Sequence, residues 1–145
     1  MGKILTVLLI FLSTLSFSQS NSQKQLHIFG GSKLDVYLGC LTCDDYSIYS
    51  IWNSYVVYGN NLNAISIWNS DGIYGGSHSM FSPFTRYATT PPVVVDKDGN
   101  FYGYFTINNS NDKRCDAPLA LTIYKSYDII RNDVAKWYLE IFKKK

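Results

Sequence analysis

Three cysteines are the residues of this chain whose chemistry is easiest to define. Cys40 and Cys43 form a CxxC pair, and Cys115 lies far from them in the sequence. In an oxidising compartment three cysteines allow one disulfide and leave one thiol over, and the sequence permits any of the three pairings. Asp44 and Asp45 follow the pair directly, and their negative charge opposes the thiolate that redox catalysis needs. A structural disulfide is therefore favoured over free thiols, metal binding or redox catalysis.

Other polar residues are weaker candidates for chemistry. Zinc would need a further ligand such as His27 or His78, and a single CxxC is a weak zinc signature. Residues 96–100 resemble the start of a calcium loop, but Phe101 stands where that loop needs glycine and Ile107 where it needs glutamate. A hairpin turn is the better interpretation. Each histidine is better explained by a structural position, so the sequence indicates no catalytic residue, no metal site and no cofactor.

Aromatic residues make up 16% of the chain, almost as much as the 17% that is charged. Exposed tyrosines would offer flat rings that stack on sugars, and neighbouring asparagine amides would bind sugar hydroxyls. The candidate ligand-binding residues are Tyr58, Tyr74, Tyr55 and Tyr87. Burial of these tyrosines in the core is an equal alternative. The tryptophans at positions 52 and 68 are better explained as core residues.

An internal repeat of sixteen residues positions these rings. Ser50-Ile51-Trp52-Asn53-Ser54-Tyr55 returns as Ser66-Ile67-Trp68-Asn69-Ser70-Asp71 and, in weaker form, as Ser82-Pro83-Phe84-Thr85-Arg86-Tyr87. The repeats extend over residues 46–93. A serine followed by proline is typical of a helix start, so each unit is predicted to open with a short helical turn. Three units are close to the minimum for a free-standing solenoid and are expected to pack on a sheet; a small β-solenoid is the alternative.

Two β-hairpins and a helix are predicted around the repeats. Residues 26–29 and 34–38 flank a glycine-rich turn, and residues 93–96 and 101–107 flank a turn that contains Asp-Gly. Near the C-terminus, apolar residues recur at helical spacing from Ile130 to Ile141. The predicted fold is α+β, with a four-stranded antiparallel sheet from two hairpins, helical-turn repeats of sixteen residues packed on it, and a C-terminal amphipathic helix.

The N-terminus predicts export. Lys3 precedes an apolar run, and Ser16 and Ser18 are the small residues that a cleavage site requires, so residues 1–18 are predicted to be a signal peptide and Gln19 the mature N-terminus. Residues 19–25 are expected to form a flexible arm and residues 26–145 a single domain. No other stretch approaches the length of a membrane helix. The predicted location is secreted or periplasmic.

Residues 26–108 resemble a group of small exported bacterial proteins with Ser-Ile-Trp-Asn and Tyr-Gly repeats. The likeness rests on Val-Tyr-Leu-Gly-Cys-Leu at 36–41, on the repeat units, and on the run from Pro91-Pro92 into residues 95–104. The resemblance implies a bacterial envelope or secreted setting, and it implies no activity, cofactor or site residue.

The small net charge limits the possible partners. A formal charge of +2 lacks the cationic excess that a nucleic-acid surface needs. The predicted function is a non-enzymatic binding or interaction module at the cell envelope, with envelope polysaccharide or another envelope protein as its partner. The alternative is a thiol/disulfide or metal-dependent protein that uses the CxxC pair.

Overall fold

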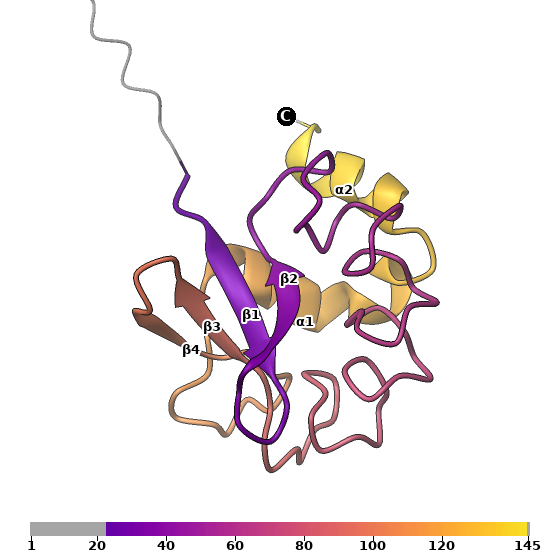
Figure 1. Cartoon of the computed structure of the whole chain (residues 1–145). Helices are drawn as coiled ribbons and strands as arrows, with labels where there is room; N and C mark the ends of the chain where they lie inside the picture. Colours follow the sequence, from indigo (N-terminus) through magenta and orange to yellow (C-terminus); the bar gives the residue numbers. More distant parts are fainter. Residues whose placement is uncertain (1–22, 145) are drawn as a thin grey trace, which may run out of the picture.

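The computed structural model describes residues 23–144 (Figure 1). The predicted signal peptide, and residues 19–22 of the predicted arm, lie outside the described residues. The elements in chain order are β1 (Leu26–Gly30), β2 (Val36–Cys40), β3 (Val93–Asp96), β4 (Phe101–Tyr104), α1 (Pro118–Ile130) and α2 (Val134–Phe142). The fold is therefore α+β, as predicted.

The four strands form one antiparallel sheet in the order β2-β1-β3-β4. This confirms the predicted four-stranded antiparallel sheet. β1 is an inner strand because it pairs with β2 on one side, where His27 lies opposite Cys40, and with β3 on the other, where Ile28 lies opposite Val94. The long connection between β2 and β3 therefore carries the chain from one side of β1 to the other.

The bounds of two strands differ from the prediction. Leu34 has a positive φ of 55° and belongs to the turn, so β2 begins only at Val36. β4 ends at Tyr104, whereas the apolar pattern continues to residue 107. The N–H of the buried Phe105 still donates to the carbonyl of Pro92, but Pro92 has no N–H to donate in return, so the strand pairing ends there.

Residues 44–90, here called the turn coil, contain reverse turns where short helical turns were predicted. The N–H of the fourth residue of each turn donates to the carbonyl of the first, and the last residue of one turn opens the next, as at Ser47, Ser50 and Asn53. From Asp44 to Gly76 the turns follow one another in a fixed order: four turns in succession each advance the chain by three residues, and the fifth advances it by four. Five turns therefore cover sixteen residues, which is the length of the repeat. The turn coil contains no helix.

Polar side chains explain why these turns form in place of a helix. Most turns open with Ser, Asn or Asp, whose side-chain oxygen accepts the N–H two residues further on, a bond that competes with helix formation. The residues that make this bond are Asp44, Ser47, Ser50, Asn53, Asn60, Asn63, Ser66, Asn69, Ser79 and Ser82. A three-residue pattern thus runs inside the sixteen-residue one.

The turn coil contributes a ladder of three rings to the core. Trp52, Trp68 and Phe84 are at most 2% exposed, and successive ring centroids lie 5.6 and 6.2 Å apart. The indole N–H of Trp52 donates to the carbonyl of Leu41, and that of Trp68 to the carbonyl of Ile51. These buried positions agree with the interpretation of the tryptophans as core.

The C-terminal region forms two helices among the described residues, where the sequence pattern predicted one. α1 begins with Pro118, at the position where a missing N–H costs no hydrogen bond. The chain leaves the helical path after Arg131, and Asp133 starts α2 by accepting the N–H of Lys136. α2 is the predicted C-terminal helix, shortened at its N-terminal end, and α1 was not predicted.

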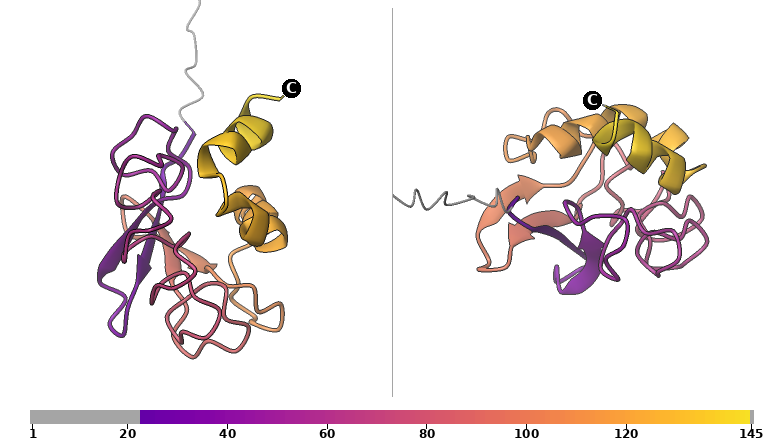
Figure 2. Two further views of the ribbon diagram at one scale, coloured as in Figure 1. Left: turned by 90° about the vertical axis from the view of Figure 1, so that its right-hand side faces the viewer. Right: turned by 90° about the horizontal axis from the view of Figure 1, so that it is seen from above.

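The sheet and the turn coil form one layer, and α1 and α2 cover one side of it (Figure 2). The core lies between the layers. Tyr127 of α1 stacks on Phe84 with ring centroids 4.3 Å apart, and Tyr138 of α2 lies 6.1 Å from Trp52. Neither of the two described helices covers the opposite face of the sheet.

Candidate functional site

The sheet face turned away from the helices carries aromatic side chains. In β1, Leu26 and Ile28 are buried, whereas His27 and Phe29 are half-buried. Because successive side chains of a strand point to opposite faces, His27 and Phe29 lie on the face that the helices leave open. Tyr37 of β2 joins them, with ring centroids 5.7 Å from His27 and 5.2 Å from Phe29.

Tyr37 is the centre of a larger group that we call the aromatic cluster. The turn coil adds Tyr58 and Tyr49, whose rings meet Tyr37 edge-on with centroids 5.1 and 6.3 Å away. These spacings lie within the roughly 4.5–7 Å of favourable aromatic pairs. The cluster consists of His27, Phe29, Tyr37, Tyr49 and Tyr58, from three separate segments of the chain.

The polar groups at the centre of the cluster are uncharged near neutral pH. His27 Nδ1 and the Tyr37 hydroxyl form a hydrogen bond of 2.8 Å. Partial burial lowers the pKa of His27 below its ordinary value, which keeps the imidazole neutral. Burial, helped by Tyr58 and Tyr49, raises the pKa of Tyr37 well above its ordinary value. The cluster therefore offers neutral rings and one fixed polar pair.

Gly39 allows the turn coil to approach the sheet at this point. It has a φ of 115°, in the left-handed region that favours glycine. A Cβ at this position would lie 2.9 Å from the Cβ of Tyr58 and 2.8 Å from Cγ2 of Ile51. The absence of a side chain thus lets the Tyr58 ring reach Tyr37.

A groove of about 400 Å³ opens over the cluster, and we call it the aromatic groove. This volume lies in the range of about 300–1,000 Å³ that is typical of small-molecule sites. His27, Phe29, Tyr37 and Tyr49 line it, and Tyr49 is 53% exposed. Gln25, Asp96 and Lys97 complete the lining. Such a surface can stack on a flat ligand and bind its polar groups at the edge.

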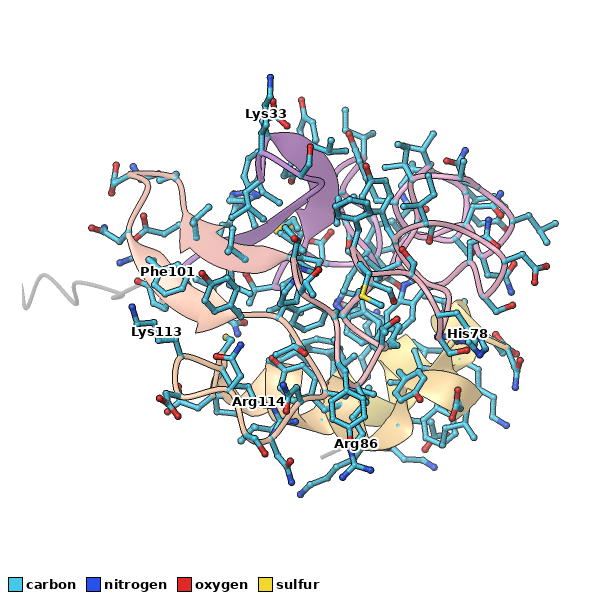
Figure 3. All side chains as sticks on the ribbon, turned by 90° about the horizontal axis from the view of Figure 1, so that it is seen from below. Lys33, His78, Arg86, Phe101, Lys113 and Arg114 are labelled. Carbon is cyan, nitrogen blue, oxygen red and sulfur yellow. A yellow bond between two sulfur atoms is a disulfide. The ribbon has the colours of Figure 1, made fainter. Side chains whose placement is uncertain are left out.

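β4 extends the aromatic face beyond the groove. Phe101 lies opposite Val95, and Tyr104 lies opposite Val93. The rings of Phe101 and Tyr104 meet edge-on with centroids 5.5 Å apart, and Phe101 is 51% exposed. Figure 3 shows Phe101 on this strand, with Lys113 close by. The open face of the sheet is therefore aromatic from β2 to β4.

The structure separates the four tyrosines that were predicted to bind a ligand. Tyr58 belongs to the aromatic cluster. Tyr74, its equivalent in the next repeat, packs against the core beside Gly30 and Gly31 of the first hairpin. Tyr55 is 96% exposed and Tyr87 is 75% exposed, and neither ring contacts the cluster.

Four residues of the cluster were not among the predicted binding residues, namely His27, Phe29, Tyr37 and Tyr49. The sequence does contain a signal for Phe29, because it alternates with buried residues in a predicted strand, as His27 does. His27 is half-buried in the sheet, which agrees with its interpretation as a strand position. His78 is exposed on the turn coil, with Nδ1 3.0 Å from the Ser77 hydroxyl (Figure 3).

The predicted disulfide is confirmed and joins Cys40 to Cys43. Cys40 is fully buried and Cys43 is 7% exposed. Cys115 is a free, fully buried thiol, and burial raises its pKa, so it stays protonated. Among the described residues, no group of three or more His, Cys, Asp or Glu side chains is placed to hold a metal ion.

Asp96 closes the turn between β3 and β4. Its carboxylate accepts the N–H groups of Asp98 and Asn100, the Asn100 side-chain amide and the Tyr102 hydroxyl. Lys24 completes the set with an ion pair of 2.8 Å. These contacts agree with the hairpin-turn interpretation of residues 96–100, because the carboxylate oxygens already have partners in the chain.

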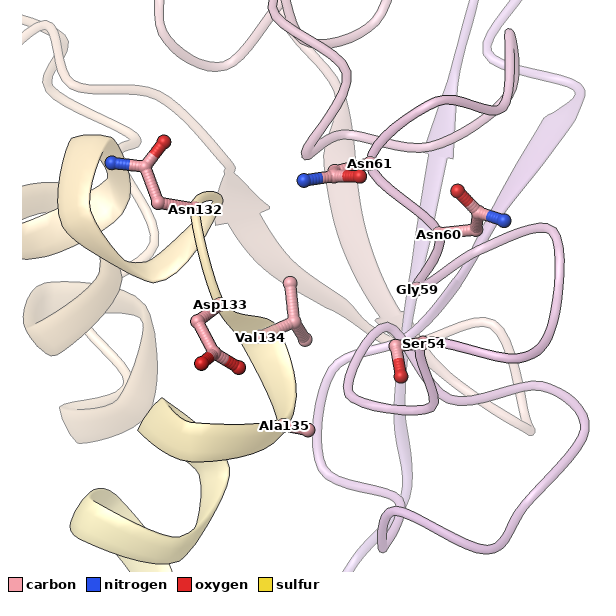
Figure 4. A pocket seen from close by; sticks show the side chains of 8 residues that line it. All are labelled: Ser54, Gly59, Asn60, Asn61, Asn132, Asp133, Val134 and Ala135. Atoms are coloured by element: carbon pink, nitrogen blue, oxygen red, sulfur yellow. The ribbon is translucent and has the colours of Figure 1, made fainter.

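A smaller polar pocket of about 200 Å³ lies between the turn coil and the break between the helices (Figure 4). Asn60, Asn61, Asn132 and Asp133 line it. The Asn61 amide donates to the Arg131 carbonyl at 2.7 Å, and Asp133 caps α2. Asn61 thus links the turn coil to the helix layer and Asp133 is engaged as the cap of α2, so the aromatic groove is the better candidate for a ligand site.

No protein-family model, curated protein or solved structure matches this chain. Neither of the helices in residues 23–144 has the length and apolar character needed to cross a bilayer.

Proposed function

We propose that this protein is a non-enzymatic binding module of the bacterial cell envelope and that its aromatic groove binds a neutral polysaccharide. The observation that carries the proposal is the aromatic cluster around Tyr37, which forms a groove on a sheet face that neither described helix covers. Flat rings stack on the apolar faces of sugar rings, and polar groups at the rim bind hydroxyls.

The composition of the turn coil also favours an uncharged ligand. Between Tyr46 and Thr85 the sequence contains one Asp, no Glu, Lys or Arg, and one histidine, namely Asp71 and His78. This part of the surface offers rings, amides and hydroxyls, including the exposed Tyr49 at the groove. Ionic attraction would then contribute little, and binding would depend on stacking and hydrogen bonds.

Export is part of the proposal. It rests on the apolar leader with small residues before Gln19, on the disulfide between Cys40 and Cys43, and on the resemblance to exported bacterial proteins. Mass spectrometry of secreted or periplasmic material should find Gln19 as the first residue. Recovery of a chain that still begins with Met1 from outside the cytoplasm would refute the predicted cleavage.

The thiol/disulfide alternative has less support. Disulfide exchange requires an attacking thiolate to reach one of the two sulfur atoms. Both Cys40 and Cys43 are buried, and Cys115 is a buried protonated thiol. A binding function therefore agrees better with the positions of the cysteines.

Binding is tested with purified peptidoglycan and a panel of neutral glycans in pull-down experiments at low and high salt. Wild type is compared with Tyr49→Ala, which removes an exposed ring of the groove, and with Tyr55→Ala, which removes an exposed ring elsewhere. We expect binding to persist in high salt, to be lost in Tyr49→Ala and to be kept in Tyr55→Ala.

Two results would contradict the proposal. Binding that is lost in salt and unchanged in Tyr49→Ala would assign it to the C-terminal lysines, whose attraction to anionic polymers is screened within about 10 Å at 0.1 M salt. If no glycan binds under either condition, another envelope protein becomes the better candidate partner.

A further inference from the structure

A second groove lies on the helix side of the sheet. It has a volume of about 410 Å³ and runs between the start of β1, the N-terminal end of α1 and the C-terminal end of α2. Its walls are mainly apolar and are formed by Leu26, Tyr102, Leu119, Ile141 and Phe142, with Pro118 beside them. We call it the apolar groove. It shares no lining residue with the aromatic groove.

The hydroxyl groups at this groove already have partners in the chain. Thr42 Oγ1 accepts the N–H of Leu26 and donates to the carbonyl of Lys24. Thr122 Oγ1 donates to the carbonyl of Pro118. The walls therefore present few polar groups to a ligand, and the body of a ligand that fits them is aliphatic.

Lys24 stands at the rim of the apolar groove. Among the described residues that line the groove, it is the one charged side chain. Its ammonium contacts the Asp96 carboxylate at 2.8 Å and lies 5.4 Å from the centre of the Tyr102 ring. These two contacts hold the ammonium in place. The side chain is 58% exposed, and an ammonium has three donors, so donors remain for an anion.

We propose that the apolar groove binds one alkyl chain of an anionic, fatty-acid-type amphiphile, with the carboxylate at Lys24. The apolar walls match the chain, and the exposed Lys24 ammonium keeps donors for the head group beside its bond to Asp96. The inference does not depend on the proposed glycan binding, because it rests on other residues on the opposite side of the sheet.

The first test is a chain-length series of octanoate, decanoate and dodecanoate, titrated into the mature protein below the micelle concentration and followed by calorimetry and NMR. Affinity should rise about fourfold per methylene until the groove is filled. Amide shifts should change at Leu119 and Phe142. Equal affinity for all three chains, or shifts confined to other residues, would overturn the proposal.

The second test compares two leucines of α1. Leu119→Glu places a charge in the groove and should weaken dodecanoate binding at least about tenfold. Leu121→Glu is the matched control, because Leu121 is 37% exposed and does not line the groove, and it should bind as wild type does. If both variants lose the same amount of dodecanoate affinity while their NMR spectra show that both are folded, the apolar groove is not the binding site.

The role of Lys24 is tested with Lys24→Met. Dodecanoate should bind this variant no more tightly than the uncharged dodecanol does, whereas the affinity for dodecanol should stay that of wild type. Retained dodecanol binding also shows that the variant is folded. If dodecanoate binds Lys24→Met and wild type equally well, the carboxylate does not lie at Lys24.

Discussion

The indole rings of Trp52 and Trp68, sixteen residues apart in the sequence, lie with their centroids 5.6 Å apart in the core. Each indole N–H donates to a backbone carbonyl from earlier in the chain, that of Leu41 or Ile51. The rings thus contribute apolar area, and their one polar atom is satisfied. Phe84 continues the ladder, so the repeat places its largest side chains in a single row against the helices.

Trp68→Ala should destabilise the protein by about 3–5 kcal/mol, because it removes the central ring of the ladder and leaves a cavity. It also leaves the Ile51 carbonyl without its indole donor. Urea denaturation measures the loss. Tyr55→Ala is the control, since Tyr55 is 96% exposed, and should change the free energy of unfolding by less than about 0.5 kcal/mol. A Trp68→Ala midpoint equal to that of wild type would contradict the core position.

Gly59→Ala should be destabilising by at least about 1–3 kcal/mol, because a Cβ there would overlap the backbone of Asn53 inside the turn coil. Gly72→Ala is the matched control. Its Cβ would meet the Asn69 side chain at 3.2 Å, a tight contact that a shift of a few tenths of an ångström relieves. The midpoint temperature of thermal unfolding should therefore be clearly lower for Gly59→Ala than for Gly72→Ala. The reverse order would show that the turns pack differently.

Stability should fall in acid, and Asp96 should account for part of the fall. The ammonium of Lys24 and then the Asn100 amide lower the pKa of Asp96 well below its ordinary value. A carboxylate that is more acidic in the folded state stabilises the fold above its unfolded pKa of about 3.9, and this contribution is lost as the pH falls below that value.

Urea midpoints of wild type and Asp96→Asn between pH 7 and pH 2.5 measure this contribution. Asp96→Asn should be less stable at pH 7 and should lose less stability in acid. Asp71→Asn, at an exposed position of the turn coil, should follow wild type. If the urea midpoints of wild type and Asp96→Asn fall by the same amount between pH 7 and pH 2.5, protonation of Asp96 is not coupled to unfolding.

The oxidised protein should expose no reactive thiol until it unfolds. Cys115 is fully buried and has a raised pKa, and Cys40 and Cys43 are joined. A colorimetric thiol titration should find one thiol per chain in denaturant and three after reduction in denaturant. Reduction of an insulin disulfide should be negligible. Rapid reaction of a thiol in the native protein would contradict the burial of Cys115.

Local patterns in the sequence determined much of the fold. Asp-Gly and Gly-Gly turns between apolar runs predicted the four antiparallel strands, because turn chemistry and strand alternation are short-range effects. The repeat identified Trp52 and Trp68 as core residues. The finer pattern of Ser, Asn and Asp every three residues was also present, and it explains why turns form where short helices were predicted.

Tertiary structure decided the candidate site. Alternation places His27 and Phe29 on one face of β1, but which face stays open depends on where α1 packs, and α1 was not predicted. The repeat makes Tyr58 and Tyr74 equivalent, yet Tyr58 reaches Tyr37 beside Gly39 whereas Tyr74 packs beneath the first hairpin. Equivalent residues of a repeat meet different neighbours once the repeat packs on a sheet that does not repeat. Contacts of this kind join residues far apart in the chain, so no local pattern encodes them.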